Sequence, residues 1–286
     1  MKIFTIATKA EGYFDLLRQT ASRWGYDLQI LGWQQTWKGF AWKLELYIVA
    51  LMKLPADEPV ICVDGYDVVV IGPADEMHKQ FKDRNHRIVF SGQRYFPNQR
   101  WMQKLADQVM SNSLSKIINK EVDNSKDYSR PCMGLLIAYA GDLLLLFQKL
   151  MEIERRKSIN DDQTLLNIYY INHPDSIHLD DKCIMFQNLW RTRRGVYGKI
   201  SSNDEHSEVE VIYDKVIESK RVRNKQYHTT ACFLHAPYKL DMGLLLNELN
   251  LTPPKMKFKN RWNYWRYSIF HHIKRALRLF LSFGRI

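Results

Sequence analysis

Residues 58–71 read Glu-Pro-Val-Ile-Cys-Val-Asp-Gly-Tyr-Asp-Val-Val-Val-Ile and hold two carboxylates, Asp64 and Asp67, between two apolar runs. The first apolar run is typical of a strand buried on both faces, as in the sheet of an α/β protein. Ligands of such sheets gather at the carboxyl ends of strands, where two acids together can hold a hard divalent cation. Asp and Gly are also common turn residues. The pattern therefore leaves a metal site and an ordinary turn open.

Strand and helix patterns alternate outward from this stretch. Short apolar runs typical of strands fall at 2–7, 28–31, 60–63, 87–91, 133–139, 176–179, 209–212 and 231–235. Helical patterns fall at 13–24, 42–54, 143–155 and 160–170. The alternation predicts an α/β fold with a parallel sheet covered by helices. Pro253-Pro254 marks the end of this domain, because proline continues neither a helix nor a sheet ladder. We therefore expect a domain at 1–254 and a tail at 255–286.

The composition is that of a globular protein with a sizeable core. Of the 286 residues, 45% are hydrophobic and 13% aromatic, which argues against extended disorder. The four cysteines form no zinc-binding pattern, and Cys62 and Cys232 lie in apolar runs, so we expect buried, reduced thiols. No run reaches the ~18 apolar residues of a membrane span, and the first apolar run is too short for a signal peptide. We expect a cytoplasmic protein.

The positive charge is concentrated in the tail. The formal net charge is +11, and residues 255–286 contain nine Lys or Arg residues and no acid. Apolar residues recur there at three- and four-residue steps from Ile269 to Leu281, with Lys274 and Arg278 off that stripe. The combination of aromatic, basic and amphipathic character predicts a helix bound to an anionic membrane surface. The alternatives are a helix docked on the domain and, less favoured, the binding of nucleic acid.

Three further places carry side chains with possible chemical roles. Residues 160–163, Asn-Asp-Asp-Gln, suit a helix with Asn160 as its N-cap and acids in its first turn, but they also put carboxylates at the mouth of a helix. His235 follows an apolar strand, where histidine is more often structural than a metal ligand. Residues 90–97, Phe-Ser-Gly-Gln-Arg-Tyr-Phe-Pro, offer aromatics that suit either stacking on a base or sugar, or a core.

The order and spacing of these pieces, from residue 3 to about residue 251, match a known family. The motifs are Ile3-Phe4-Thr5-Ile6-Ala7-Thr8-Lys9, the Asp-x-Tyr-Asp turn at 64–67, Phe90-Ser91, Gly134-Leu135-Leu136-Ile137-Ala138, Asp161-Asp162-Gln163, Phe186-Gln187-Asn188-Leu189, Val222-Arg223-Asn224 and His235. In these motifs the chain resembles the glycosyltransferase domain of the procollagen lysyl hydroxylase/glycosyltransferase enzymes and its bacterial and viral relatives. The resemblance implies a GT-A fold, which is a Rossmann-like mixed sheet flanked by helices, with a UDP-sugar donor and Mn²⁺ (or Mg²⁺).

The resemblance also implies roles for individual residues. Asp64, Asp67 and His235 match the protein ligands of the metal, which binds the donor diphosphate and neutralises the charge of the leaving group. Asp161 and Asp162 match acids that position the sugar or act at the reaction centre. The positions implied for donor binding are Thr8, Lys9, Lys43, Asp64, Asp67 and Lys239.

The chain departs from the family pattern around these residues. Asn160 stands where relatives have a longer run of Asp, and Gln93 replaces a family acid. Pro131-Cys132-Met133-Gly134 replaces Asn-Ser-Gly-Gly, and His235-Ala236-Pro237-Tyr238 replaces His-Gly-Asn-Gly. Because the metal triad is intact, we interpret these changes as a different sugar or acceptor.

The residues and the resemblance together predict a metal-dependent hexosyltransferase. The tail favours a glycan or lipid-linked acceptor, as in lipopolysaccharide or capsule assembly, with the protein peripheral on the inner face of the membrane. The alternatives are a collagen-type hydroxylysine glycosyltransferase and a catalytically silent nucleotide- or glycan-binding scaffold. A haloacid-dehalogenase-type phosphatase is disfavoured, because that chemistry needs two acids two residues apart, and Asp64 and Asp67 are three apart.

Overall fold

The structure, a computed structural model, covers most of the expected domain. It describes residues 1–93, 128–159, 161–189, 200–203, 207–237 and 240–254. The helix expected within 255–286, Lys239 and the aromatics at 95–96 lie outside these residues. None of the helices in the described ranges combines the length and the apolar character that crossing a bilayer requires.

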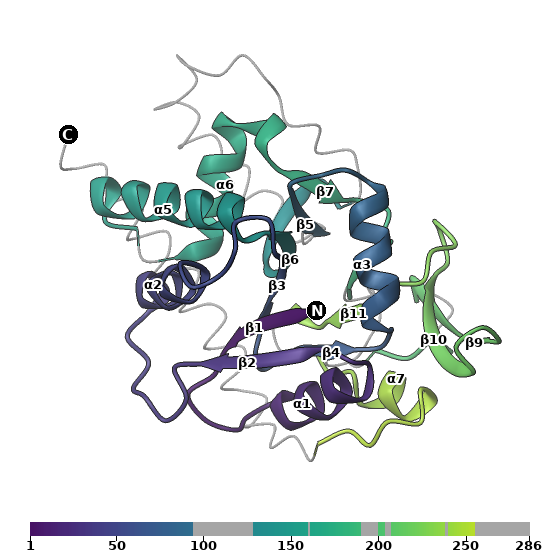
Figure 1. Cartoon of the computed structure of the whole chain (residues 1–286). Coiled ribbons are helices and arrows are strands. Elements are labelled where there is room, and N and C mark those ends of the chain that lie inside the picture. The colour runs from purple at the N-terminus through teal and green to yellow at the C-terminus, as the bar shows by residue number, and fades with distance from the viewer. Residues whose placement is uncertain (94–127, 160, 190–199, 204–206, 238–239, 255–286) are drawn as a thin grey trace, which may run out of the picture.

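The centre of the molecule is a six-stranded sheet with the order β2-β1-β3-β6-β5-β7 (Figure 1). Its strands are β1 (Lys2–Ile6), β2 (Asp27–Leu31), β3 (Pro59–Asp64), β5 (Ile88–Gln93), β6 (Arg130–Tyr139) and β7 (His178–Asp180). β1 pairs in parallel with both β2 and β3, and β5 pairs in parallel with β7. The carboxyl ends of β1 and β3 therefore meet, with Ile6 opposite Asp64.

β6 runs antiparallel to both of its neighbours, β3 and β5. The parallel sheet expected from the alternating patterns is therefore wrong, whereas the mixed sheet implied by the resemblance is confirmed. The error has a physical reason. β6 is buried along nearly its whole length, and a strand covered on both faces shows the same apolar run in either direction.

Helices cover both faces of this sheet (Figure 1). The helices of one face are α2 (Phe40–Leu51), α5 (Ala140–Lys157) and α6 (Asp162–Asn172), and those of the other are α1 (Phe14–Arg23) and α3 (Ala74–Asp83). Successive residues of β3 serve different cores: Val60 and Cys62 pack with α2 and α5, whereas Ile61 and Val63 pack with α1 and α3. This alternation follows from the two-residue period of a strand and explains why β3 is apolar throughout.

A second sheet has three strands in the order β4-β11-β8. Its strands are β4 (Val68–Val70), β8 (Phe186–Asn188) and β11 (Phe233–His235). The central strand, β11, is antiparallel to β4 and parallel to β8. The other described elements are the hairpin of β9 (Val209–Asp214) and β10 (Ser219–Asn224), the short helix α7 (Gly243–Glu248) and the 3-10 helix η2 (Pro174–Ser176). Since β4 follows β3 directly, the turn at 64–67 joins the two sheets.

Most of the expected elements are present, with ends that shift by a few residues. The strand expected at 231–235, for example, begins at Phe233. The α-helices and strands that were not expected are α3, β4, β8, β10 and α7, although Ala74, Met77 and Phe81 of α3 follow helical spacing and are buried. All four cysteines are buried and free, which confirms the reduced thiols expected in the apolar runs.

The position of β6 in the core can be tested by truncating one side chain. Leu136 has no exposed surface, so Leu136→Ala leaves a cavity and should lower the free energy of unfolding by about 2–5 kcal/mol in urea titrations. Leu145→Ala is the matched control, because Leu145 on α5 is 62% exposed and its truncation should change stability by less than about 0.5 kcal/mol. Equal effects of the two substitutions would contradict the burial of β6.

Candidate metal and donor site

The turn at 64–67 packs tightly against the end of β1. A Cβ atom on Gly65 would lie 2.8 Å from the carbonyl oxygen of Ile6, so a larger residue does not fit without a shift. The hydroxyl of Tyr66 accepts a hydrogen bond from the N–H of Thr8 at 2.9 Å. The turn is therefore fixed to the carboxyl ends of the strands, which is where ligands of α/β sheets bind.

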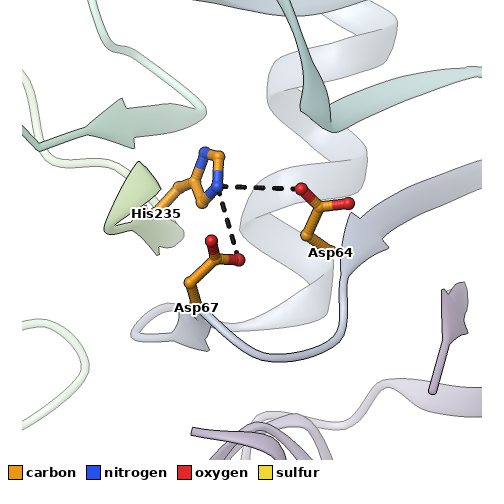
Figure 2. Close-up of side chains that lie close together, drawn as sticks. All are labelled: Asp64, Asp67 and His235. Carbon is orange, nitrogen blue, oxygen red and sulfur yellow. Dashed lines mark ion pairs between the residues drawn. The ribbon is translucent and has the colours of Figure 1, made fainter. Parts of the chain in front are cut away.

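Strand pairing brings His235 to this turn from a distant part of the sequence. In the smaller sheet His235 pairs with Val68, and the N–H of Ala236 donates to the carbonyl oxygen of Asp67 at 2.8 Å. His235 Nε2 lies 3.5 Å from Asp67 Oδ1 and 4.0 Å from Asp64 Oδ2. The three side chains point toward one another from two segments, the turn at 64–67 and the end of β11 (Figure 2).

This cluster has the donor atoms and the space that a divalent cation needs. One possible ligand atom from each of Asp64, Asp67 and His235 lies within 4.8 Å of the other two. Asp67 Oδ1 and His235 Nε2 are buried and have no hydrogen-bond partner among the described residues. Gly134 leaves room beside them, since a Cβ there would lie 2.5 Å from His235 Cε1 and 2.8 Å from Asp64 Oδ2. Two carboxylates and one imidazole together supply oxygen and nitrogen donors that fit a divalent cation.

The charges within the cluster support one another. Burial disfavours the charged form of Asp64, but the Lys43 ammonium and then His235 outweigh it and hold the pKa of Asp64 below its ordinary value. Burial likewise disfavours the imidazolium of His235, but Asp67 outweighs it, so the pKa of His235 lies well above its ordinary value. Without a metal, His235 therefore supplies positive charge to the two carboxylates. A bound cation would replace that proton, because only the neutral imidazole is a ligand.

Lys43 links the cluster to the start of α6. This buried side chain lies with Nζ 2.7 Å from Asp64 Oδ1 and 2.9 Å from Asp162 Oδ2. Burial disfavours the ammonium, but Asp162 and Asp64 outweigh it and hold the pKa of Lys43 well above its ordinary value. Burial raises the pKa of Asp162 although Lys43 acts in the opposite direction. The three groups form one ion network, in which loss of one partner leaves an uncompensated buried charge.

The two acids expected at the reaction centre have different places in the structure. Asp161 is the N-cap of α6, and its side chain accepts a hydrogen bond from the N–H of Thr164 at 3.3 Å. The expected N-cap was Asn160, so the prediction is wrong by one residue: the cap is Asp161, and Asn160 lies outside the described residues. Asp162 is only 4% exposed and turns inward to Lys43. Asp162 is thus the acid that joins the ion network.

The remaining donor positions are placed less closely around the cluster. Thr8 lies at the turn through its contact with Tyr66. Lys9 is exposed and pairs with Glu11 at 2.8 Å, which directs its ammonium to a surface acid. Lys239 lies outside the described residues, so its role stays a prediction.

The segment that departs from the family pattern forms one wall of the cluster. Cys132 Sγ lies 3.6 Å from His235 Nδ1. Gln163, in the first turn of α6, accepts a hydrogen bond from the N–H of Met133 at 2.9 Å and donates one to the carbonyl oxygen of Pro131 at 2.8 Å. The start of α6 thereby fixes the backbone of β6 beside the cluster. Nothing in the sequence pattern indicated this role, because glutamine is ordinary in a first helical turn.

The mixed sheet, the helices on both of its faces and the acids that follow β3 fit a glycosyltransferase domain of the GT-A class. The sequence model of one family, the PLOD GT domain, matches residues 1–257. The chain belongs to this family, which comprises the glycosyltransferase domains of procollagen lysyl hydroxylases.

Individual relatives are similar to this chain over most of its length. The chain is 26% identical over 263 residues to chicken procollagen-lysine,2-oxoglutarate 5-dioxygenase 1, and the match covers 86% of this chain and 31% of the relative. The same identity and coverage hold for human multifunctional procollagen lysine hydroxylase and glycosyltransferase LH3. A Drosophila procollagen-lysine,2-oxoglutarate 5-dioxygenase is 24% identical over 216 residues, which are 70% of this chain and 27% of the fly protein. The chain thus spans less than a third of the length of these curated relatives.

The space that Gly134 leaves can be tested directly. Gly134→Ala puts a methyl group against His235 and Asp64, so we expect the affinity for Mn²⁺ to fall by about tenfold or more in titrations followed by electron paramagnetic resonance. Gly25→Ala is the control, because Gly25 has a positive φ of 77° but no atom within 4 Å of an added Cβ. That change should cost stability and leave Mn²⁺ binding intact. Unchanged Mn²⁺ affinity in Gly134→Ala would rule out a cation between these side chains.

Proposed function

We propose that this domain transfers a hexose or a related sugar from a UDP-sugar to an acceptor hydroxyl, with the help of a divalent metal ion. One arrangement carries the proposal: Asp64 belongs both to the cluster with Asp67 and His235 and to the ion network of Lys43 and Asp162. The possible cation ligands therefore lie next to the charged pair of Lys43 and Asp162, near the carboxyl ends of β1 and β3.

Asp64, Asp67 and His235 would hold Mn²⁺ or Mg²⁺. When bound, the ion supplies positive charge to the diphosphate of the donor, which makes a nucleoside diphosphate a better leaving group. The two oxygens of Asp64 have different neighbours. Oδ1 accepts a hydrogen bond from Lys43 at 2.7 Å, which leaves Oδ2 facing His235. Lys43 therefore fixes the rotation of a metal ligand and adds a positive charge beside the donor.

Asp162 is the residue we assign to the reaction centre, with Asp161 next to it. Asp162 Oδ2 is buried and lies 2.9 Å from the Lys43 ammonium. A carboxylate accepts several hydrogen bonds, so a sugar hydroxyl could bind beside Lys43. Burial raises the pKa of Asp162, which suits a carboxyl group that exchanges a proton with a hydroxyl. Thr8, Lys9 and Lys239 are assigned to donor binding by the resemblance.

The acceptor has two candidates. The first is a glycan or lipid-linked acceptor at the inner membrane face, which depends on the basic residues at 255–286, outside the described residues. The second is hydroxylysine in a collagen-like peptide, which is favoured by the human relative, whose name contains both lysine hydroxylase and glycosyltransferase. Sugar transfer to a hydroxylysine peptide, but not to the same peptide with lysine, would identify the second; transfer to lipid-linked acceptors in vesicles would identify the first.

Metal dependence of donor turnover is the central test. With UDP-Glc, UDP-Gal, UDP-GlcNAc or UDP-xylose, we expect hydrolysis or transfer in Mn²⁺ and none in EDTA. Asp67→Asn weakens a metal ligand and should lower kcat/KM by about 100-fold or more, because the charge of the leaving group is then poorly stabilised. Asp15→Asn is the matched control, since Asp15 is an exposed acid on α1.

Two results would count against the proposal. Activity that survives both chelation and Asp67→Asn would remove the metal from the mechanism. Binding of UDP-sugars without turnover of any donor would favour a nucleotide- or glycan-binding scaffold instead.

Asp162 should affect the chemical step more than metal binding. Asp162→Asn keeps the shape of the side chain but removes its charge, so we expect kcat to fall by about 100-fold or more. Mn²⁺ affinity should fall much less than in Asp67→Asn, because Asp162 is outside the cluster. Asp175→Asn, an exposed acid in η2, controls for the loss of one negative charge. A loss of Mn²⁺ affinity as large as that of Asp67→Asn would instead make Asp162 part of the metal site.

A further inference from the structure

Asn188 is the strand partner of His235 in the smaller sheet. β11 pairs in parallel with β8, in a register that puts His235 opposite Asn188. The N–H of Leu189 donates to the carbonyl oxygen of His235 at 2.8 Å, which locks this register. Both side chains are buried, with 3% of Asn188 and 2% of His235 exposed. Asn188 meets the imidazole at Nδ1, whereas the two acids of the cluster face Nε2.

The hydrogen bonds around Asn188 determine which nitrogen of His235 carries the proton. The carbonyl oxygen of Gly92 can only accept, so at 2.6 Å it takes a hydrogen bond from the amide nitrogen Nδ2 of Asn188. The amide oxygen Oδ1 therefore faces His235, where it lies 2.7 Å from Nδ1. This oxygen also can only accept, so Nδ1 is the donor. A neutral imidazole then has its lone pair at Nε2, the atom that faces Asp64 and Asp67.

We propose that Asn188 is a positioning residue of the metal cluster, which holds His235 in the tautomer and orientation that present Nε2 to a divalent cation. This inference rests on the proposed function, because it needs a metal between Asp64, Asp67 and His235. Asn188 acts through His235 and is not itself a ligand. A hydrogen bond to the far nitrogen of a ligand histidine fixes the ring and raises its basicity, and its loss typically weakens metal binding by about 10- to 100-fold.

A second neighbour of Nδ1 does not replace this interaction. Cys132 Sγ lies 3.6 Å from Nδ1, whereas Asn188 Oδ1 lies at 2.7 Å. A thiol sulfur is a weak acceptor, so the amide oxygen is the stronger partner. Asn188 is also held from its other side, because Gln187 donates to its backbone carbonyl oxygen at 3.0 Å and receives a hydrogen bond from Asn224 at 3.0 Å. The amide is therefore preorganised before a metal binds.

Mn²⁺ binding by the whole chain tests this role without any need for turnover. Asn188→Leu keeps the branching at Cγ but removes the acceptor, so we expect the Kd for Mn²⁺ to rise by about tenfold or more. Asn188→Asp retains an oxygen toward Nδ1 and should bind Mn²⁺ much more tightly than Asn188→Leu. The control is Asn172→Leu, the same substitution at an exposed position near the end of α6, which should bind Mn²⁺ like the wild type. Cys132→Ala, which removes the weaker neighbour of Nδ1, should weaken Mn²⁺ binding less than Asn188→Leu does.

The protonation state of His235 provides a second readout. In ¹⁵N NMR spectra of the protein with Mg²⁺, which is diamagnetic, we expect the imidazole proton on Nδ1 in the wild type. A proton on Nε2 would exclude this nitrogen as a metal ligand, so it would overturn both the metal site and the role of Asn188, even if Asn188→Leu does not fold.

The outcomes separate the two proposals. A wild type that binds no Mn²⁺ overturns the proposed function, and with it the basis of this inference. A wild type that binds Mn²⁺ while Asn188→Leu binds it equally well overturns the role of Asn188 alone. If Asn188→Asp binds Mn²⁺ no more tightly than Asn188→Leu, Asn188 contributes to packing and does not position His235.

Discussion

The position of β11 between β4 and β8 is the constraint on which the site depends. His235 ends this strand and receives a different neighbour from each side: Asp67 from the segment before β4 and Asn188 from β8. Both neighbours are placed by backbone hydrogen bonds, from Ala236 to Asp67 and from Leu189 to His235. Backbone pairing fixes positions more closely than flexible side chains do, and sites built on strands are correspondingly precise. The geometry of the cluster is thus a property of the sheet.

The ionised side chains of the site also leave a net negative charge, which favours the binding of a cation. Three carboxylates, Asp64, Asp67 and Asp162, face one ammonium, Lys43, and one imidazole, His235. Even with a protonated imidazole, ionised carboxylates leave one negative charge uncompensated in a largely buried group. A divalent cation on a neutral imidazole removes that excess. Buried charge is costly unless it is paired, so a bound divalent cation would stabilise the ionised form of this network.

Local patterns in the sequence predicted the elements of the fold but not the contacts between them. The run at 58–71 was enough to predict a buried strand that ends in two acids, because burial on both faces and turn chemistry are local properties. The direction of β6 was beyond such reasoning, and so was the approach of His235, since both depend on pairing between distant strands. Only the resemblance to a family indicated that His235 belongs with Asp64. Asp161 and Asp162 differ in role because of where α6 begins. Asp161 becomes the N-cap of the helix, whereas Asp162 starts its first turn and points inward to Lys43.

The departure from the family pattern at 131–134 includes two positions, Pro131 and Met133, whose contacts with Gln163 involve backbone atoms alone. Gly134 is constrained by space, because any Cβ there would enter the cluster, and it is retained. Gln163 holds its neighbours through backbone atoms, the N–H of Met133 and the carbonyl oxygen of Pro131. A carbonyl oxygen is offered by every residue and an N–H by every residue except proline, so the side chains at these two positions can change while the wall stays in place. Evolution of this segment can therefore alter what the wall presents to a substrate without displacing Gly134 from the metal cluster.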